Sequence, residues 1–435
     1  MQSDKDTVAS NYFIANYPPF SFWKPDGVKE ALAALQRPAD SETPLGLYLH
    51  IPFCRKRCHF CYFKVYTGKG SREILGYLDA LVRELELYAR RPFVNGRHLD
   101  FIYFGGGTPS YLSARQLSAL VGELKQHFSW DHAREITFEC EPGTLTPGKL
   151  ELLRDLGVTR LSLGVENFDD HVLEINGRAH RSREIWDVYE RASRLDFPQV
   201  NIDLIAGMVD ETEENWRRCV EKTLQLQPDS VTVYQMEIPF NTTIYQRMRE
   251  QGQTRAPVAD WPTKRRWVDL AFQELERNGY HVASAYTAVR SPERSRFLYR
   301  DQLWSGADMM ALGVASFSHV GGTHFQNEHD MGPYLRRLDQ GELPLHRALT
   351  PTREERLIRE LILQLKLGRV RTGYFRNKFQ VDILERFADP IGELAGEGYM
   401  TASPEELELS REGLLQVDRL LPLFFLREHQ DSRYT

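Results

Sequence analysis

The feature that most constrains the fold is a repeated alternation of strand-like and helix-like segments that begins near residue 46. Short apolar and β-branched runs are each followed by an amphipathic segment, and these runs are "LGLYLHI", "DFIYF", "EITFEC", "TRLSLGV", "VNIDLIAG" and "SVTVYQM". The helix-like segments cover residues 73–90, 113–127, 147–156, 182–194, 212–226 and 262–278. Strands and helices that alternate in this way form parallel strands joined by crossover helices. The pattern predicts an α/β fold, a closed or partly closed (β/α)6 barrel with its chemistry at the carboxyl ends of the strands.

Three further stretches lie outside this alternation. Residues 1–45 include "NYFIANYPPFSFWKP", which has no helical or strand period, and are expected to form an N-terminal extension, either a lid or a packed strap. The barrel should then cover residues 46–285, and residues 286–349 should form a connection that completes it. Residues 350–435 begin with the amphipathic "TREERLIRELILQLKL" and continue as helix, hairpin and helix, the order of a winged-helix α+β domain. The neutral balance of charge favours a cap packed on the barrel over DNA binding.

Composition and charge exclude several classes of protein. The 435 residues carry a formal net charge of −6, so no global positive field attracts nucleic acid or anionic lipid. No apolar run reaches the length that crosses a bilayer, and the N-terminal "MQSDKDTVAS" lacks the pattern of a signal peptide. The five cysteines, three of them close together, suit metal binding in a reducing compartment better than disulfides. We expect a cytoplasmic protein without a membrane span or a nucleic-acid partner.

The clustered cysteines have the spacing C-x-x-x-C-x-x-C in a loop directly after the first predicted strand. Their thiols belong to Cys54, Cys58 and Cys61. A structural zinc ion takes four protein ligands, and His50 or His59 could be the fourth. No second C-x-x-C pair supports zinc, because the remaining cysteines stand alone at Cys140 and Cys219. A [4Fe-4S] cluster normally takes four cysteines, so three would leave one iron open for a non-protein ligand.

This loop, on the first strand-to-helix connection of a barrel, resembles the signature of the radical S-adenosylmethionine (SAM) superfamily. The motifs "YLHIPFC", "YFGGGTPSYL", "FECEP", "RLSLGVENF", "NIDLIAG" and "LGVASFS" resemble the oxygen-independent coproporphyrinogen III oxidase (HemN/HemW-like) family in order and spacing. The resemblance implies a radical SAM partial TIM barrel with a [4Fe-4S] cluster, whose open iron SAM chelates through its amino and carboxylate groups. The implied chemistry is reductive cleavage of SAM to methionine and a 5′-deoxyadenosyl radical.

The same resemblance implies cofactor contacts at particular positions of this sequence. Positions that match contacts to the cluster-bound SAM are Tyr48, Gly106, Glu139 and Phe317. Positions that match contacts to a second SAM are Phe60, Gly107, Thr108, Arg178 and Asp203. The glycines of "GGGTPS" suit close approach of backbone N–H groups to a ligand, or simply a tight turn. Arg178 could be an ordinary surface cation, whereas Asp203 stands between apolar neighbours and needs a ligand or a buried cation.

Two positions depart from the family pattern by adding a carboxylate. Glu166 stands where a glutamine that binds the second SAM is usual, and Glu237 stands where a small residue is usual. Added carboxylates change the charge and the hydrogen bonding of a cofactor pocket. Alternation along the first strand places His50 on the same face as Tyr48. We predict Tyr48, His50, Glu166 and Glu237 as catalytic candidates, the two glutamates also as cofactor contacts.

Other departures bear on the reaction. Phe63 stands where coproporphyrinogen oxidases proper carry a fourth cysteine, and Tyr299 and Arg300 stand where haem-chaperone members carry a His-Asn pair. The first hypothesis is therefore one-carbon transfer from a second SAM, as methylation or cyclopropanation, which resembles a three-cysteine branch of the family. The second is oxygen-independent coproporphyrinogen oxidation, and the third is a haem-carrier role.

The expected partners follow from these hypotheses. The substrate should be a small unsaturated molecule, aromatic or tetrapyrrole-like, and the electron donor a flavodoxin or ferredoxin; a partner methyltransferase is a further candidate. Basic side chains that could pair with the propionates of a tetrapyrrole are Arg290, Arg294 and Arg296. A solvated loop is the equal alternative for these arginines.

Overall fold

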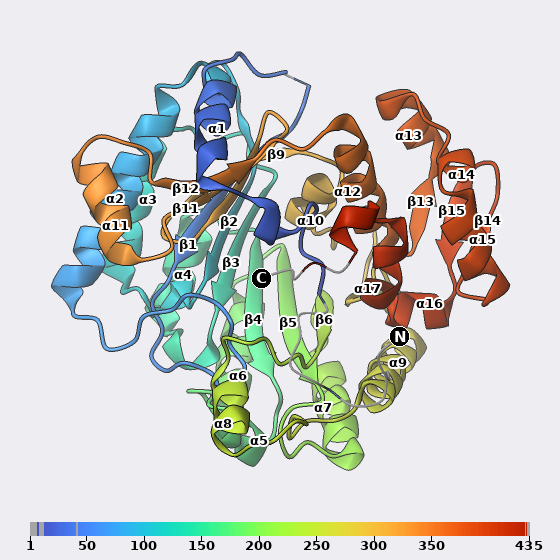
Figure 1. Cartoon of the computed structure of the whole chain (residues 1–435). Helices are drawn as coiled ribbons and strands as arrows, with labels where there is room; N and C mark the ends of the chain where they lie inside the picture. Colours follow the sequence, from blue (N-terminus) through green and yellow to red (C-terminus); the bar gives the residue numbers. More distant parts are fainter. Residues whose placement is uncertain (1–6, 8–12, 41, 431, 433–435) are drawn as a thin grey trace.

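The computed structural model describes residue 7 and residues 13–40, 42–430 and 432. Its largest element is a twelve-stranded sheet with the order β12-β11-β10-β9-β1-β2-β3-β4-β5-β6-β8-β7 (Figure 1). The six predicted strands stand at its centre as β1 (Leu45–Ile51), β2 (Leu99–Gly106), β3 (Glu135–Cys140), β4 (Arg160–Glu166), β5 (Gln199–Ala206) and β6 (Ser230–Gln235). They pair in chain order and in parallel. The order is linear, so the barrel is partly closed, and the predicted α/β architecture is confirmed.

One main helix follows each central strand. These helices are α2 (Ser71–Ala89), α3 (Ala114–His127), α4 (Pro147–Asp155), α6 (Ser182–Arg194), α7 (Glu213–Leu226) and α9 (Trp261–Arg277), within two residues of the predicted segments. Helix α3 is typical: the Ser113 hydroxyl accepts a hydrogen bond from the Gln116 N–H at 3.2 Å, and leucines along one face are buried. Two short helices that the sequence did not predict, α5 (Asp170–Ile175) and α8 (Thr243–Glu250), share a small apolar cluster near the end of β5.

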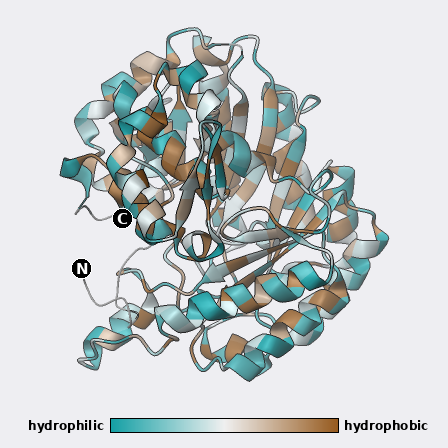
Figure 2. Ribbon diagram, turned by 90° about the vertical axis from the view of Figure 1, so that its right-hand side faces the viewer, coloured by the Kyte–Doolittle hydropathy of each residue, from teal (hydrophilic) through white to brown (hydrophobic). Residues whose placement is uncertain are grey.

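The first strand shows how the sheet positions a site. Leu47, Leu49 and Ile51 are fully buried in the main apolar core, whereas Tyr48 and His50 alternate with them on the other face. Figure 2 shows hydrophobic residues concentrated on the strands, with hydrophilic residues on the surrounding helices. The inner face of the partly closed barrel is therefore the face available to polar groups.

The connection after α9 extends the sheet at both edges. The strands β7 (His281–Val282) and β8 (Thr287–Val289) join beside β6, and β8 runs antiparallel to it. Helix α10 (Leu298–Trp304) then leads to β9 (Asp308–Leu312), which pairs in parallel with β1. The remaining elements are β10 (Phe317–Val320), β11 (Thr323–Asn327), α11 (Met331–Asp339) and β12 (Leu345–Leu349), whose strands are antiparallel.

The C-terminal part has its own small sheet and apolar cluster. It begins with α12 (Arg353–Leu365), and its three-stranded antiparallel sheet has the order β13-β15-β14. Its other elements are β13 (Arg369–Arg371), α13 (Thr372–Phe379), α14 (Ile383–Arg386), α15 (Ala388–Gly396), β14 (Met400–Ala402), β15 (Glu406–Leu409), α16 (Arg411–Leu415) and α17 (Val417–Leu420). Helices followed by a hairpin and further helices match the predicted order, while the exact domain boundaries stay a prediction.

The described part of the N-terminal extension packs against both parts of the molecule. Ile14 and Tyr17 are buried in the apolar cluster of the C-terminal part. Further along, Lys24 pairs with Ala348 of β12, and α1 (Val28–Leu35) packs on the neighbouring strands. Residues 1–6 and 8–12 of the predicted extension lie outside the described residues. Among the helices that the structure describes, none is long and apolar enough to cross a membrane.

Candidate active site

The cysteine loop follows β1 and is held at both of its ends. The Tyr66 N–H donates to the Pro52 carbonyl oxygen at 2.7 Å, and the Cys54 N–H donates to the Tyr66 carbonyl oxygen at 3.2 Å. In the middle of the loop, the His59 N–H donates to the Asn176 carbonyl oxygen at 3.0 Å. The His59 ring nitrogen Nδ1 lies 2.9 Å from the Ile175 carbonyl oxygen, so this histidine is engaged with α5. The loop is thus closed at its base by its own backbone and tied in its middle to the segment at the end of α5.

The surroundings of the thiols suit thiolates that bind a metal cluster. The Thr108 hydroxyl donates to Cys54 Sγ at 3.3 Å, and Arg178 Nη1 donates to Cys58 Sγ at 3.2 Å. A Cβ at Gly107 would lie 3.0 Å from Cys54 Sγ, so a residue without a side chain is required beside this thiol. Burial raises the pKa of the Cys54 thiol to about 11 and that of Cys61 to about 12. Cluster iron would have to displace these protons, because thiolates are the metal ligands.

The residues present fit a four-iron cluster better than a single ion. Among the described residues, no group of three or more histidine, cysteine, aspartate and glutamate side chains is placed to hold one metal ion. Three cysteines that ligate a four-iron cluster each bind a different iron, so their sulfur atoms need not converge on one point. The hydroxyl and the guanidinium that donate to the thiols are polar contacts of the kind that set the reduction potential of such clusters.

The carboxyl ends of β1 to β3 bring a second group of predicted residues together. The Tyr48 hydroxyl lies 3.3 Å from His50 Nδ1, so both side chains share the inner face. Glu139 accepts a hydrogen bond from the Gly106 N–H at 3.2 Å and another from the Tyr103 hydroxyl at 2.6 Å. Burial raises the pKa of Glu139 to about 7. Gly106 has φ of 109°, and a Cβ there would lie 2.6 Å from the His50 ring, so both the backbone and the space require a glycine.

The ends of β4 and β5 hold the other predicted carboxylates. Glu166 has a left-handed φ of 64°, and its Oε1 lies 3.6 Å from Arg178 Nη1. Arg178 Nη2 donates to the Gly164 carbonyl oxygen at 2.6 Å, so this arginine is a buried connector rather than a surface cation. Asp203 accepts hydrogen bonds from Ser162 Oγ and Asn201 Nδ2, both at 2.9 Å. Burial raises the pKa of Glu166 to about 7 and also raises the pKa of Asp203.

The remaining predicted residues lie around this centre. Phe60 packs on the apolar cluster beside α8, and Glu237 is half-buried just beyond β6, where its charge acts on Tyr62. Phe317 opens β10 and packs against the N-terminal extension, with its ring centroid 4.6 Å from that of Phe20. Phe63 is 45% exposed and stacks on the Tyr62 ring, with centroids 4.5 Å apart.

The structure also shows inner-face residues that sequence reasoning missed. Tyr103 holds Glu139, and its ring centroid lies 4.3 Å from that of Tyr299 on α10. Arg160, the first residue of β4, is only 2% exposed, and its charge acts on Asp203. Both residues could have been found from the sequence, because each is a polar residue within an otherwise apolar strand. The alternation of side chains along a strand would have placed them on the inner face, opposite the core leucines.

Comparisons with known proteins agree with this architecture. Residues 48–222 match the Radical SAM superfamily. The chain is 28% identical over 413 residues to the oxygen-independent coproporphyrinogen III oxidase of Escherichia coli (strain K12), covering 90% of this chain and 88% of that protein. It is 27% identical over 379 residues to the heme chaperone HemW of Bacillus subtilis (strain 168), covering 87% and 98%.

A solved structure extends the likeness to the whole fold. Coproporphyrinogen III oxidase (HemN) from Escherichia coli, described as a radical SAM enzyme, superposes with a TM-score of 0.82 at 25% identity, covering 96% of this chain and 99% of that one. The cofactors are accordingly a [4Fe-4S] cluster and SAM. The chain is therefore a radical SAM enzyme with HemN-like and HemW-like relatives along nearly its whole length.

Proposed function

We propose that this enzyme uses a second SAM molecule for one-carbon transfer, as methylation or cyclopropanation, to an unsaturated carbon of a small molecule. The observation that carries the proposal is Phe63, the residue at the position of the fourth cysteine of coproporphyrinogen oxidases proper. Its ring is 45% exposed and stacks on Tyr62 beside the cysteine loop. An exposed pair of aromatic rings can pack on a flat acceptor, whereas it cannot replace the chemistry of a thiol.

The proposed cluster ligands are Cys54, Cys58 and Cys61, with SAM at the remaining iron. When bound, the cluster and SAM supply a 5′-deoxyadenosyl radical. Arg178 would hold the Cys58 sulfur through its Nη1 donor, and Thr108 would hold the Cys54 sulfur through its hydroxyl. The Thr108 donor favours the Cys54 thiolate over the thiol, so it opposes the effect of burial on the pKa of Cys54.

The charge of the inner face supports two cationic ligands. Burial raises the pKa values of Glu139, Glu166 and Asp203, so the charges of Arg160 and Arg178 only partly offset the cost of burying these carboxylates. SAM carries a positive sulfonium and a positive ammonium group, so one SAM offsets the charge near Glu139 and a second offsets it near Glu166 and Asp203. By resemblance, the pocket of the cluster-bound SAM includes Tyr48, Gly106 and Phe317. The pocket of the second SAM includes Phe60, Gly107 and Glu237. His50 is proposed beside the first pocket.

Oxygen-independent coproporphyrinogen oxidation is the second candidate, because the relatives that cover most of the chain carry that name. Against it, Glu166 and Glu237 add negative charge where a substrate with several carboxylates would require positive charge. A haem-carrier role has less support, since Tyr299 packs on Tyr103 and Arg300 pairs with Asp301 at 2.7 Å. A reduced flavodoxin or ferredoxin remains the proposed electron donor.

The test is anaerobic reconstitution, followed by reduction in the presence of SAM that carries a deuterated methyl group. One-carbon transfer predicts deuterium in the 5′-deoxyadenosine, because the radical then takes a hydrogen from the methyl group of the second SAM. Mass spectrometry reads this directly, and a Cys54→Ala variant is the control that should form no 5′-deoxyadenosine. Undeuterated product, together with loss of two carboxyl groups from added coproporphyrinogen III, would replace the proposal by the second candidate.

A further inference from the structure

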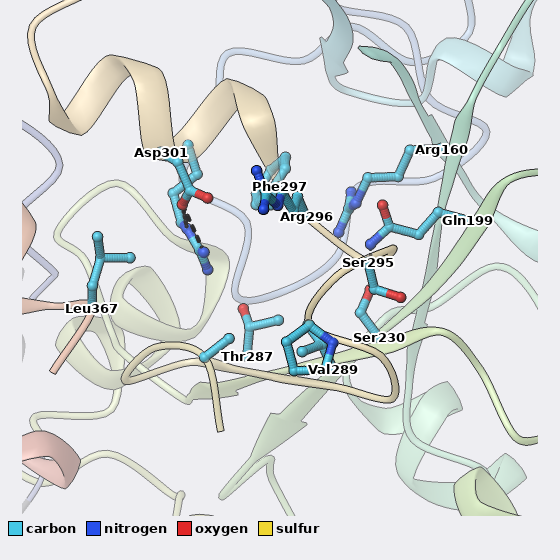
Figure 3. Close-up of a pocket in the computed structure, with 13 residues that line it drawn as sticks. Arg160, Gln199, Ser230, Thr287, Val289, Ser295, Arg296, Phe297, Asp301 and Leu367 are labelled. Atoms are coloured by element: carbon cyan, nitrogen blue, oxygen red, sulfur yellow. Dashed lines mark hydrogen bonds and ion pairs between the residues drawn. The ribbon is translucent and has the colours of Figure 1, made fainter. Parts of the chain in front are cut away.

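A cavity of about 320 Å³ lies at the amino ends of β4, β5 and β6, the end of the barrel opposite the cysteine loop. The first residues of these strands, Arg160, Gln199 and Ser230, form one side of it. Figure 3 shows Thr287 and Val289 of β8 below the cavity, and Asp301 and Leu367 across from Arg160. A space of this size could be filled by ordered water, so its chemistry depends on the groups that face it.

Arg160 is the unusual group in this lining. Its side chain is only 2% exposed, yet its Nε and Nη1 have no hydrogen-bond partner among the described residues. The guanidinium carbon lies 4.1 Å from the centre of the Phe297 ring, and in Figure 3 the guanidinium points into the space between Phe297 and Gln199. A buried guanidinium with unused donors is costly unless a ligand accepts its hydrogen bonds.

The neighbouring carboxylates do not fill that role. Glu135 accepts hydrogen bonds from the N–H groups of Leu298 at 2.7 Å and Tyr299 at 3.1 Å, at the start of α10. Asp203 is held by the side chains of β4 and β5 described above. Both carboxylates balance the charge of Arg160 from a distance without using its donors. The site therefore fits one carboxylate rather than a ligand with many negative charges.

The other polar groups of the cavity divide into engaged and available ones. Arg300 is engaged, since it pairs with Asp301 at 2.7 Å and donates to Ser284 Oγ at 3.1 Å. The buried Ser295 and the exposed Arg296 also line the cavity. Of the three arginines predicted to pair with propionates, Arg296 is thus the one that lines this cavity.

A row of aromatic rings leads from Arg160 toward the predicted SAM residues. The Phe297 centroid lies 5.7 Å from that of Tyr299, the Tyr299 centroid 4.3 Å from that of Tyr103, and the Tyr103 centroid 5.8 Å from that of Tyr48. All four rings are half-buried. On the opposite strand, Tyr234 of β6 is 40% exposed, although alternation places it on the inner face. The barrel interior therefore presents open aromatic surface between the cavity and Tyr48.

We propose that this interior is the acceptor site, and that the acceptor is a flat unsaturated molecule with one carboxylate, which Arg160 binds at the floor of the barrel. A guanidinium offers paired donors that match the two oxygens of a carboxylate, and aromatic rings pack on a flat π-system. The unsaturated end of the molecule then lies toward Tyr48. The acceptor role rests on the proposed function, whereas the binding of a flat carboxylate does not.

The experiment compares two probes of equal shape on the reconstituted full-length enzyme. Calorimetry gives the Kd of 4-biphenylcarboxylate and of the uncharged 4-biphenylmethanol. We expect the carboxylate to bind roughly tenfold more tightly or better, and Arg160→Gln to abolish that preference. Phe297→Ala should weaken both probes, because its ring contacts the flat part of either one. Arg294→Gln removes an exposed arginine from the same segment and should change neither Kd.

Equal affinity of the two probes for the wild-type enzyme, or an unchanged preference in Arg160→Gln, would overturn the proposal. Removal of Arg160 could also unfold the chain, so Arg160→Lys serves as a second variant that keeps the positive charge. This variant should lose most of the preference, since an ammonium cannot donate in the paired geometry. Formation of 5′-deoxyadenosine by the wild-type enzyme is measured separately without probe. Failure there would count against the proposed function and leave the binding result intact.

Discussion

Glu139 shows how burial can prepare one side chain for a cationic ligand. Its carboxylate has two hydrogen-bond donors, yet its pKa is raised to about 7 because it is buried. Below pH 7 the group is protonated, and a cation that binds the ionised form must then displace the proton. SAM should therefore bind about tenfold more weakly at pH 6 than at pH 8. Calorimetric titration of the reconstituted enzyme with SAM at both pH values measures this difference.

The control for this pH dependence is Glu139→Gln, which cannot ionise. The variant should bind SAM more weakly at pH 8 and show a smaller change between pH 6 and pH 8 than the wild-type enzyme. The amino group of SAM titrates in both proteins, so only the difference between them reports on Glu139. An identical pH dependence in both proteins would show that Glu139 does not face the ligand.

Arg178 connects the cysteine loop to the acidic inner face, because it contacts Cys58 Sγ and Glu166 and donates to the Gly164 carbonyl oxygen. Arg178→Gln should lower the free energy of unfolding of the cluster-free protein by about 3 kcal/mol, since it leaves a buried carboxylate without its cation. Less iron should also be retained after reconstitution. Urea unfolding and iron analysis measure the two effects.

Arg181→Gln is the matched control for Arg178. Arg181 pairs with Glu174 at 3.2 Å, and its side chain is 38% exposed. An exposed ion pair contributes little, so the free energy of unfolding should change by less than about 0.5 kcal/mol. An equal loss of unfolding free energy in the two variants would mean that the Arg178 contacts stabilise the protein no more than an exposed ion pair does.

At the scale of elements, the sequence predicted those that bury one face along their whole length. The six strands and their main helices repeat an apolar pattern for long enough to be recognised. Helices α5, α8 and α10 are shorter than the window in which a helical period becomes visible, so they were missed. Residues inside the barrel, such as Arg160 and Tyr103, were missed because their neighbours come from distant strands. Glu139 and Asp203 were proposed because they match cofactor contacts of the family that the sequence resembles, and for Asp203 the cost of burying a carboxylate within an apolar run pointed the same way.

The N-terminal extension can be tested as an element through Tyr17. Its ring is fully buried against Phe425, with centroids 4.9 Å apart, and its hydroxyl lies 2.7 Å from His429 Nδ1. Tyr17→Ala should lower the free energy of unfolding by about 3–5 kcal/mol, because it leaves a large cavity and removes these contacts. Urea unfolding of the purified chain measures the change.

Leu32→Ala on α1 is the control for the extension, since Leu32 is 37% exposed. Its effect should stay below about 0.5 kcal/mol. The N-terminal extension was predicted to be either a packed strap or a lid, and a second measurement separates the two. If it is a strap, Tyr17→Ala leaves the rate of 5′-deoxyadenosine formation per folded molecule unchanged. If it is a lid, the variant changes that rate. A stability loss no greater than that of Leu32→Ala would show that the strap is not structural.

At the scale of the whole molecule, Asp418 of α17 joins three parts of the chain. Its carboxylate accepts a hydrogen bond from the Ile14 N–H at 2.9 Å and another from the Tyr286 hydroxyl. It also pairs with Lys366 Nζ at 2.7 Å, and the Lys366 side chain is completely buried. The N-terminal extension, the end of the barrel and the C-terminal part thus share one buried charge pair.

Asp418→Asn should therefore lower the free energy of unfolding of the whole molecule. Removing one partner of a buried ion pair costs about 3–5 kcal/mol, because the buried Lys366 then keeps only the weaker effect of the Glu237 charge. Burial lowers the pKa of Lys366, and loss of Asp418 should lower it further. Above this lowered pKa the unfolded chain binds more protons than the folded one, so the stability of the variant should rise relative to wild type between pH 7 and pH 9. Urea unfolding at the two pH values measures the rise, and Glu397→Gln, at an exposed position, should show none. A constant difference between Asp418→Asn and wild type at both pH values would mean that Lys366 keeps its proton and that the junction depends on hydrogen bonds alone.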